Sequence, residues 1–488
     1  MTRLLVWNRG EIALRACLAA RRLGVPTVLF LTPADVETPA ARVADALHLH
    51  GASEASRSFN DLDVLRATIA ATGATHVYPG YGFLSESASL ARAVAEAGAV
   101  FVGPPAEVLE EMAHKVTAKA LARDAGLADL GIPLEPDGAG GFVRPPAEAF
   151  PLLLKASAGG GGRGNLVVER PEGFDEAVAK LRRRAKELFS DDSLLAERYL
   201  VHARHVELQV FGVLGDGVRI LDSRDCSLQR NHQKVIEEGP ASDAALALLE
   251  PVYGALAAAL ARRGYRNAGT IELLHAPDEG RIYFLEMNPR IQVEHPVTEL
   301  RLGIDLVEWQ LREALGIRRE ELMMHPLAPR GHAIQARLYA EDPANGFAPD
   351  AGLVHHLDLP SMPFVRWDLA VREGASIAPH YDPMIAKLIV QGHDRADALS
   401  RLAHALDHAH VHGVRTNLDL LRALAAHPPF AGDVHDTRTL EKDLGALTEE
   451  STPPGFAAES LLVEDLHEPT RTTGHPGGGL RWKLAHRS

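Results

Sequence analysis

Hydrophobic and polar positions over the first 105 residues alternate in a strand and helix rhythm. The apolar run LLVW (4–7) is followed by a polar turn, a helical pattern over 11–24 and a second apolar run, VPTVLFL (25–31). The same order returns in THVYPGYGFLSE (75–86), a helical pattern over 88–98 and AVFVGP (99–104). Strands separated by helices are typical of a parallel sheet. We therefore expect a small doubly wound α/β sheet ending near residue 105. Its first loop, NRGEIA, lacks the G-x-G-x-x-G spacing of dinucleotide sites.

Further along the chain the pattern changes several times. We expect one helix over 106–126, closed by a glycine, and then a turn-rich stretch over 129–141. Two apolar runs around a glycine-rich centre (151–169) predict a strand pair, and 174–189 reads as a basic helix. From about residue 203 strand patterns dominate, with helices and a mixed sheet reaching about residue 445. The Pro/Gly-rich segment 447–488 is interpreted as a linker or mobile terminus.

Composition narrows the class of protein. Of 488 residues, 46% are hydrophobic and 24% are charged, as in ordinary globular chains. The formal net charge of −14 argues against a nucleic-acid partner, although small anions can still bind locally. We expect neither a signal peptide nor a membrane-spanning helix. Cys17 and Cys226 are the two cysteines, which favours a reducing, cytoplasmic setting without disulfides.

The stretch KASAGGGGRG (155–164) is the first candidate site. Four glycines between two strands can be a flexible hairpin. They can also let successive backbone N–H groups approach phosphate oxygens, because no Cβ is in the way. Lys155, at the end of an apolar strand, would add a positive charge to such an anion site. The residues themselves leave both readings open.

A second candidate lies in TIELLHAPDEGRIYFLEMN (270–288). If a hairpin loop spans 277–281, Ala276 lies opposite Ile282 and Glu272 lies opposite Glu286. Like charges opposed in apolar surroundings are costly unless a cation shares the site. With Asn288 they form the oxygen donor set that Mg²⁺ prefers. A register slip of one residue would instead turn the two glutamates to opposite faces.

The segment RIQVEH (290–295) follows directly. If it is extended, Arg290, Gln292 and Glu294 share one face, while Ile291 and Val293 point to the other. A guanidinium, an amide and a carboxylate in a row could bind a small oxyanion and supply a base. Without the adjacent glutamate pair, the same pattern would describe a solvated strand face.

Three other polar strings are less specific. His232 and Lys234 in SRDCSLQRNHQKVIEE, and Arg337 in HAIQARLYAEDP, are each more typical of a surface when taken alone. The histidines of HALDHAHVHG, from His404 to His412, have i, i+4 spacing but no nearby set of acidic or thiol ligands. We do not expect a zinc site there.

Taken together, these stretches resemble the biotin carboxylase component of biotin-dependent carboxylases, in the ATP-grasp superfamily. The resemblance covers about residues 1–445. Its motifs are NRGEIA (8–13), PGYGFLSE (79–86), KASAGGGGRG (155–164), RHVELQV (204–210), RDCSLQRNHQKVIEE (224–238), EMNPRIQVEHPVTE (286–299), ARLYAEDP (336–343) and YDPMIAKL (381–388). It implies an α/β chain with a doubly wound N-terminal domain (1–112), an ATP-grasp domain (113–330) with a mobile lid at about 130–203, a C-terminal mixed-sheet domain (331–446) and a tail (447–488).

The resemblance also implies a role for each matching residue. ATP would be bound by Lys115, Lys155, Gly159, Gly160, Gly161, Gly162, Glu197, Leu200, His205 and His232. Mg²⁺ ions (two, or Mn²⁺) would be held by Glu272, Glu286 and Asn288. Bicarbonate and biotin would be bound by Lys234, Arg290, Gln292, Val293, Glu294 and Arg337. In this reading Glu294 deprotonates bicarbonate, Lys234 helps hold bicarbonate or carboxyphosphate, and Arg337 stabilises the biotin enolate.

The implied activity is a ligase reaction, the ATP-dependent carboxylation of biotin, as the first half-reaction of an acetyl- or propionyl-type CoA carboxylase of fatty acid metabolism. No methionine flanks a lysine as in a biotinylation site, so biotin is expected on a separate carrier protein. A carboxyltransferase and a second copy of this chain are the other expected partners. Two alternatives stay open: another ATP-grasp ligase, which Arg337 disfavours, and an idle regulatory subunit. Ala158 and Trp7, where relatives have smaller residues, keep the second alternative open.

Overall fold

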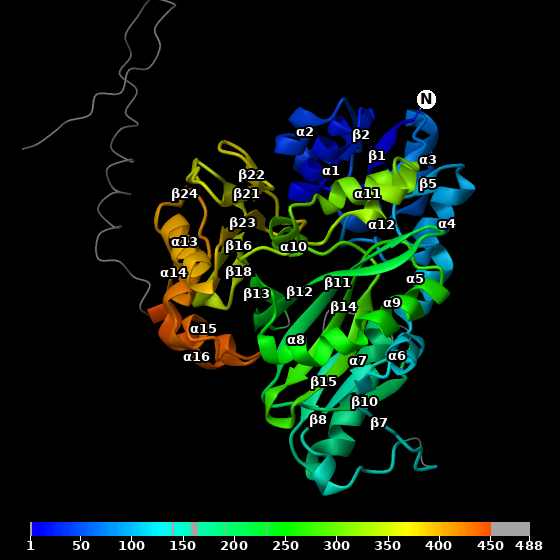
Figure 1. Cartoon of the computed structure of the whole chain (residues 1–488), viewed down its shortest axis with the longest axis vertical. Coiled ribbons are helices and arrows are strands. Elements are labelled where there is room, and N and C mark those ends of the chain that lie inside the picture. Colours follow the sequence, from blue (N-terminus) through cyan, green and yellow to red (C-terminus); the bar gives the residue numbers. More distant parts are fainter. Residues whose placement is uncertain (1, 139–140, 158–163, 190, 232, 450–488) are drawn as a thin grey trace, which may run out of the picture.

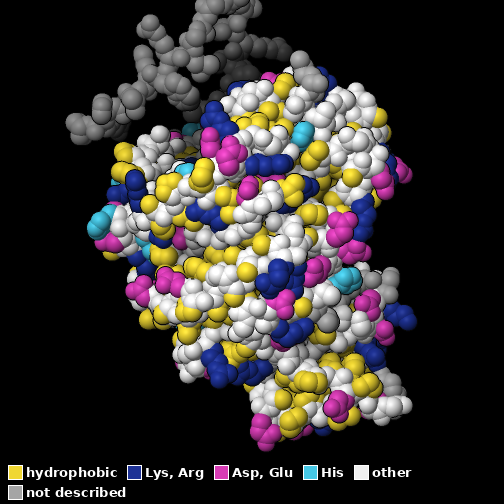
Figure 2. Space-filling model, turned by 45° about the vertical axis from the view of Figure 1, so that its right-hand side comes forward, with side chains coloured by type: hydrophobic (Ala, Val, Ile, Leu, Met, Phe, Trp, Pro, Cys, Tyr) yellow, Lys and Arg dark blue, Asp and Glu magenta, His cyan; other side chains and the backbone are white. Residues whose placement is uncertain are grey.

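The computed structural model describes residues 2–138, 141–157, 164–189, 191–231 and 233–449. The N-terminal sheet and its helices form one end of the molecule, and a small four-stranded unit forms the other (Figure 1). Between them runs a nine-stranded sheet, with the helices of the C-terminal part on one side. Lys/Arg and Asp/Glu side chains are interspersed over the face seen in Figure 2. The predicted α/β fold class is confirmed.

The N-terminal sheet is parallel and has the order β3-β2-β1-β4-β5. Its strands are β1 (Leu4–Val6), β2 (Thr27–Leu31), β3 (Ala46–Leu49), β4 (His76–Tyr78) and β5 (Val100–Phe101). The helices that accompany it are α1 (Gly10–Arg22), α2 (Pro39–Val43), α3 (Leu62–Thr72) and α4 (Ala88–Glu96). Strand β2 is buried throughout, as expected for a parallel strand covered on both faces. The doubly wound arrangement expected from the hydrophobic pattern is therefore confirmed.

The single helix predicted over 106–126 is wrong, because the structure has two helices. They are α5 (Ala106–Ala113) and α6 (Lys115–Asp124), and His114 between them has extended backbone angles. Leu109 of α5 packs into the N-terminal core, whereas Leu121 of α6 packs into the core of the central sheet. Helix α5 also contributes Val108 and Met112 to the core of the central sheet, so it packs between the two cores.

The glycine-rich segment lies in the small four-stranded sheet, of order β7-β10-β8-β9. Its strands are β7 (Gly131–Ile132), β8 (Leu152–Ala156), β9 (Asn165–Val168) and β10 (Leu194–Arg198), and α7 (Phe174–Phe189) covers it. Strands β8 and β9 are antiparallel, with Lys155 opposite Asn165. The predicted strand pair around the glycines and the basic helix are confirmed.

The nine-stranded sheet has the order β21-β23-β16-β13-β12-β11-β14-β15-β6. Its strands are β6 (Ala128–Asp129), β11 (Arg204–Val213), β12 (Gly217–Arg230), β13 (Gln233–Gly239), β14 (Asn267–Ala276), β15 (Arg281–Asn288), β16 (His332–Tyr339), β21 (Val365–Leu369) and β23 (Met384–Gly392). Because β16 pairs with β13, this sheet continues without a break across the expected boundary at residue 330. Residues from both sides of that boundary can therefore share one site.

The remaining elements surround the central sheet. The helices are α8 (Asp243–Leu249), α9 (Tyr253–Arg262), α10 (His295–Leu302), α11 (Leu306–Leu315), α12 (Arg319–Met324), α13 (Arg395–Asp407), α14 (Leu418–Ala426), α15 (Pro428–Ala431) and α16 (Thr439–Glu449). The short strands, in pairs, are β17 (Glu341–Asp342) with β18 (Ala348–Pro349), β19 (Gly352–Leu353) with β22 (Ser376–Ile377), and β20 (His356–Asp358) with β24 (His410–His412). Helix α16 extends three residues past 446, and the rest of the expected tail lies outside the described residues.

One helical stretch, Asp243–Arg262, is apolar and long enough to cross a membrane by length and composition alone, with a mean hydropathy of 1.7. In the fold it comprises α8, a 3₁₀ turn and α9. Leu249, Leu256 and Leu260 pack into the core of the central sheet. Packing against the central sheet explains why these three positions are apolar.

Candidate active site

The two glutamates of the predicted hairpin face each other across β14 and β15. Glu272 is paired with Glu286, as expected from the sequence. The predicted turn register is wrong, because Ala276 lies opposite Arg281 and not Ile282. An extra residue on β15, Leu285, shifts the register and restores the glutamate pair. The bulge therefore places both carboxylates on one face of the sheet.

Asn288 follows Glu286 by two residues on β15, so the two side chains leave the strand on the same side. Glu272, Glu286 and Asn288 together offer only oxygen donors, which suits the hard cation Mg²⁺. The opposed carboxylates also create the negative charge that a divalent cation would neutralise. The donor set fits the predicted metal role.

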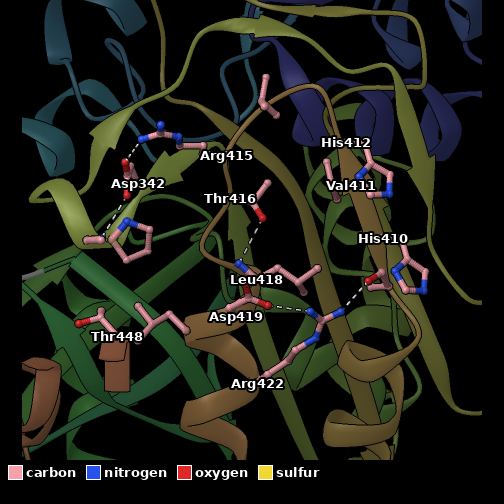
Figure 3. A pocket seen from close by; sticks show the side chains of 15 residues that line it. Asp342, His410, Val411, His412, Arg415, Thr416, Leu418, Asp419, Arg422 and Thr448 are labelled. Carbon is pink, nitrogen blue, oxygen red and sulfur yellow. Dashed lines mark hydrogen bonds and ion pairs between the residues drawn. The ribbon is translucent and has the colours of Figure 1, made fainter. Parts of the chain in front are cut away.

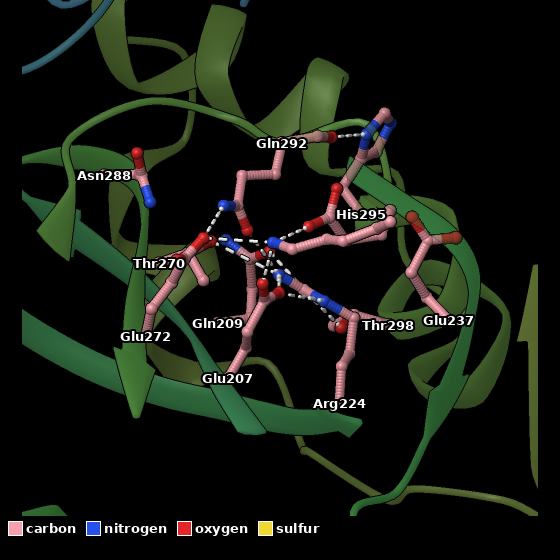
Figure 4. Close-up of polar contacts among 12 residues, drawn as sticks. Glu207, Gln209, Arg224, Glu237, Thr270, Glu272, Asn288, Gln292, His295 and Thr298 are labelled. Carbon is pink, nitrogen blue, oxygen red and sulfur yellow. Dashed lines mark hydrogen bonds and ion pairs between the residues drawn. The ribbon is translucent and has the colours of Figure 1, made fainter. Parts of the chain in front are cut away.

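Lys234 of β13 joins the glutamate pair to the segment that follows it. Its Nζ donates to Glu272 Oε1 at 3.0 Å, to Glu294 Oε1 at 2.6 Å, and to Glu207. Gln292 Nε2 also donates to Glu272 Oε1, at 2.7 Å. Figure 4 shows Glu207, Glu272 and Gln292 converging on this point from separate parts of the chain. Residues more than 80 positions apart thus form one polar cluster.

The extended strand predicted over 290–294 is wrong, because β15 ends at Asn288 and the chain turns before α10. Glu294 is the residue that precedes α10. Arg290 turns toward the N-terminal unit, where its Nε lies 2.8 Å from Glu86 Oε1. Gln292 and Glu294 still lie in one site, as predicted. Lys234 donates to Glu294 and to Glu272, and Gln292 donates to the same Glu272. Tertiary contacts, and not strand alternation, bring them together.

Arg337 of β16 reaches the same carboxylate from the C-terminal part of the chain. Its Nη2 donates to Glu294 Oε2 at 3.1 Å, and its Nε donates to Glu237 Oε1 at 2.5 Å. Glu294 is therefore held between two cations, Lys234 and Arg337. All of these side chains are at least nine-tenths buried.

A second layer of buried charge, which was not predicted from the sequence, lies beneath this cluster. Arg224 of β12 is fully buried and donates to Glu207 Oε2 at 3.0 Å and to Gln209 Oε1 at 2.8 Å. It also donates to Thr298 of α10 and to Gln292, at 2.9 and 3.2 Å (Figure 4). The available signal was the alternation of polar and apolar residues inside strands that are otherwise buried, as in RHVELQV.

Burial and neighbouring charges set the ionisation of the cluster. Burial alone would raise the pKa of Glu294, but Lys234, Arg337 and Arg224 outweigh it and hold the pKa below the ordinary value. For Lys234, burial works to lower the pKa, yet Glu207, Glu272 and Glu294 raise it well above the usual range. Glu294 is consequently ionised and Lys234 is charged at neutral pH.

Lys155 lies near the C-terminal end of β8, an inner strand of the four-stranded sheet, and has a carboxylate partner. It pairs with Glu197 of β10, and Lys119 of α6 also contacts Glu197, with an Nζ to Oε1 distance of 3.0 Å. Lys119 lies 3.1 Å from Asp129 as well. The structure thus brings together two predicted residues, Lys155 and Glu197, with Lys119, which the sequence argument did not single out.

The other predicted nucleotide residues are spread around this region. His205 of β11 has its Nε2 at 3.2 Å from Glu272 Oε2, which connects it to the glutamate pair. Burial would lower the pKa of His205, but Glu272 raises it above the ordinary value. Leu200 packs near Tyr283 after β10. Lys115 begins α6, its side chain outside the described part. Gly159, Gly160, Gly161, Gly162 and His232 lie outside the described residues.

A cavity of about 350 Å³ lies elsewhere, in the C-terminal part (Figure 3). Asp342, His410, His412 and Arg415 are among its lining residues, and it includes none of the predicted site residues. The rings of His404 and His408 lie 4.3 Å apart. Among the described residues, the groupings of three metal-ligating side chains do not include them.

Known protein families match three parts of the chain. The model of the biotin carboxylase N-terminal domain matches residues 1–109. The ATP-binding domain of the carbamoyl-phosphate synthase L chain matches residues 146–322, and the biotin carboxylase C-terminal domain matches residues 335–442.

Individual relatives give the same result. A biotin carboxylase of Haemophilus influenzae is 38% identical over 457 residues, which cover 91% of this chain and 99% of that protein. The alpha subunit of mitochondrial methylcrotonoyl-CoA carboxylase from rice (Oryza sativa subsp. japonica) is 40% identical over 462 residues, 92% of this chain, but the match spans only 61% of the rice protein.

Solved structures of other proteins also resemble the structure of this chain. The biotin carboxylase domain dimer of Hydrogenobacter thermophilus 2-oxoglutarate carboxylase, a complex with MgADP, ADP and bicarbonate, has a TM-score of 0.83 at 33% identity, covering 91% of this chain and 98% of that one. A Campylobacter jejuni biotin carboxylase in complex with a β,γ-ATP compound has a TM-score of 0.81 at 33% identity, covering 90% and 98%. With its three domain matches and its buried carboxylate and lysine cluster, the chain belongs to the biotin carboxylase family.

Proposed function

We propose that this protein uses ATP and bicarbonate to carboxylate biotin attached to a separate carrier protein, through a carboxyphosphate intermediate. The observation that carries the proposal is the position of the Glu294 carboxylate, held between Lys234 and Arg337 and beside Gln292 and the glutamate pair. A base, two fixed cations and an oxygen-donor metal site meet in one buried cluster. Such a cluster can receive a small oxyanion next to a phosphate-bearing substrate.

In this proposal Glu294 accepts the bicarbonate proton, and a carbonate oxygen attacks the γ-phosphorus as ADP leaves. The low pKa makes Glu294 a weak base in the free protein. When bicarbonate binds, it accepts hydrogen bonds that Lys234 or Arg337 otherwise donate to Glu294. The Glu294 carboxylate then loses part of its stabilisation, and the pKa of Glu294 rises. The substrate itself would therefore strengthen its base.

The other residues supply charge neutralisation and positioning. Mg²⁺ held by Glu272, Glu286 and Asn288 would neutralise phosphate oxygens during transfer. Lys155 would hold the phosphates on the side of the small sheet. Carboxyphosphate would then split into carbon dioxide and phosphate, and the phosphate would take the proton of the biotin ureido nitrogen. That nitrogen would attack the carbon dioxide, while Arg337 stabilises the negative charge that develops on the ureido oxygen.

The partners and setting are proposed from the family. A biotin carboxyl carrier protein and a carboxyltransferase would complete an acyl-CoA carboxylase, of acetyl or propionyl type and thus of fatty acid metabolism. The relatives named methylcrotonoyl-CoA carboxylase show that this family also serves another acyl-CoA. Selection of the acyl group is therefore assigned to the carboxyltransferase. A homodimer and a cytoplasmic setting complete the proposal.

One experiment separates this proposal from its alternatives. ADP release is measured in the presence of bicarbonate, with and without free biotin. Stimulation by biotin is expected. ATP turnover that depends on bicarbonate but is indifferent to biotin would favour another ATP-grasp ligase. ATP binding without turnover would indicate an idle regulatory subunit.

A further inference from the structure

The motif YDPMIAKL contains a lysine that the proposed reaction does not use. Lys387 lies on β23 and its side chain is fully buried. A buried ammonium group needs partners for its charge and for its three N–H donors. The partners of Lys387 come from three separate parts of the chain, so this ammonium group marks a point where those parts meet.

Two of these partners are close. Lys387 Nζ lies 3.0 Å from Glu11 Oε1, at the start of α1, and donates to the Val293 carbonyl oxygen at 3.1 Å. Asp368 of β21 is farther, at 3.7 Å. The N-terminal unit, the loop before α10 and the outer strands of the central sheet therefore meet at one ammonium group.

The backbone of Lys387 lies within the sheet, whereas the loop that its side chain contacts does not. In the sheet, Lys387 is paired with Arg337 on one side and with Asp368 on the other. The loop over 289–294 belongs to neither a strand nor a helix. A donor rooted in the middle of a sheet can therefore set the position of this loop.

The hydrogen bond from Lys387 reaches the peptide unit that leads into Glu294. The Val293 carbonyl and the Glu294 backbone nitrogen belong to the same planar peptide unit, so fixing the carbonyl orients the backbone of Glu294. The preceding carbonyl, of Gln292, is held by His295 Nδ1 at 2.6 Å. Two successive carbonyls are thus held, while the side chains of Gln292 and Glu294 reach Glu272 and Lys234.

The N-terminal unit reinforces this arrangement. The Tyr81 hydroxyl donates to Glu11, the acidic partner of Lys387. Glu86, from the same segment, pairs with Arg290 at the start of the loop. The segment over 79–86 therefore contacts the loop directly at one end, and through Glu11 and Lys387 at the other.

We propose that Lys387 is a positioning residue for the bicarbonate site: its hydrogen bond to the Val293 carbonyl holds the 289–294 loop so that Gln292 reaches Glu272 and Glu294 reaches Lys234. The inference rests on the proposed function, because it assigns bicarbonate to these side chains. A displacement near 1 Å at a reacting group can cost about 10²-fold in rate. Loss of this contact should therefore weaken bicarbonate use by about 10- to 100-fold.

The test must not leave Glu11 as an uncompensated buried charge, which could unfold the protein. The variant is the charge-balanced pair Glu11→Gln with Lys387→Met; if it does not fold, Glu11→Gln with Lys387→Gln replaces it, since the glutamine side chain is too short to reach the carbonyl. The matched control is Asp222→Asn with Arg301→Met, which removes another buried ion pair, 2.7 Å long, from the far end of α10.

Steady-state ATP hydrolysis gives separate KM values for bicarbonate and for ATP. We expect the bicarbonate KM of the Lys387 variant to rise about 10- to 100-fold, with the ATP KM nearly unchanged and both KM values of the control near wild type. The stabilising effect of bicarbonate on Tm should be lost in the variant, while that of ATP remains. An unchanged bicarbonate KM would overturn the inference. If the wild-type protein lacked bicarbonate-dependent hydrolysis, the proposed function would fail, and this inference with it.

Discussion

Replacing Glu294 by glutamine tests the centre of the proposed site. The change keeps the shape of the side chain but removes the charge between Lys234, at 2.6 Å, and Arg337, at 3.1 Å. Loss of a general base reduces the rate by about 10²- to 10⁴-fold. With about 1.36 kcal/mol per factor of ten, this is about 3–5 kcal/mol of transition-state stabilisation.

The same change also affects stability. Removing one member of a buried ion pair costs about 3–5 kcal/mol when the remaining charge has no other partner. Here Lys234 keeps Glu207 and Glu272, and Arg337 keeps Glu237. We therefore expect the loss of folding free energy to lie at or below the lower end of that range, so the variant should fold and bind ATP.

A matched control separates the two effects. Glu238, next to Glu237 on β13, is equally buried and pairs with His332 at 2.7 Å and Arg395 at 2.7 Å. Glu238→Gln should lose similar stability but retain carboxylation. The assay is carboxylation of free biotin at saturating bicarbonate, alongside ATP affinity and thermal unfolding. A normal carboxylation rate in Glu294→Gln would refute the assignment of the base, and so would an equal loss of activity in Glu238→Gln.

Three further predictions follow from the structure. Glu272→Gln and Glu286→Gln should each raise the Mg²⁺ concentration for half-maximal ATP hydrolysis at least about tenfold, and an unchanged requirement would contradict the metal assignment. Burial raises the pKa of Glu341 from 4.5 to about 7, so its contribution to stability is present below its ordinary pKa and is lost as the pH rises to about 7. The Tm of wild type minus that of Glu341→Gln should accordingly fall over this range, and a flat difference would count against it. Trp7 packs 4.2 Å from the Phe30 ring and donates to the Phe59 carbonyl at 3.0 Å; Trp7→Ala should cost about 3–5 kcal/mol in denaturant unfolding, and a loss below about 1 kcal/mol would show that the core repacks.

Local patterns predicted much of the fold because they depend on near neighbours in the chain. The N-terminal strands and helices and the strand pair around KASAGGGGRG follow from periodicity and turn signals. The Glu272–Glu286 pair is predicted from the wrong turn register, and the bulge at Leu285 restores it. The helix over 106–126 failed for a reason outside that information. The apolar positions suit one helix, but the backbone is extended at His114, between α5 and α6. Helix α5 packs against the N-terminal core through Leu109 and against the central core through Val108 and Met112.

The site shows the same division. The residue types at 272, 286, 288, 292 and 294 suit a metal and an oxyanion site before any contact is known, whereas the role of Arg337 came only from the family resemblance. The sequence could not show that the 289–294 segment turns instead of continuing as a strand. It also could not show that Arg224 and Glu207 compensate each other's charge, because their pairing depends on the register of β11 and β12.

The sequence by itself determined the family, the elements near the chemistry and the kinds of side chain available for it. The tertiary structure decided which charges meet: Lys234 with three carboxylates, Arg337 with Glu294, and Lys387 with Glu11. It also placed the Lys387 ammonium group beside the Val293 carbonyl. The physical reason is that a buried charge is stable only beside a partner of opposite sign. In this protein those partners come from strands that are distant in sequence and adjacent only in the folded sheet.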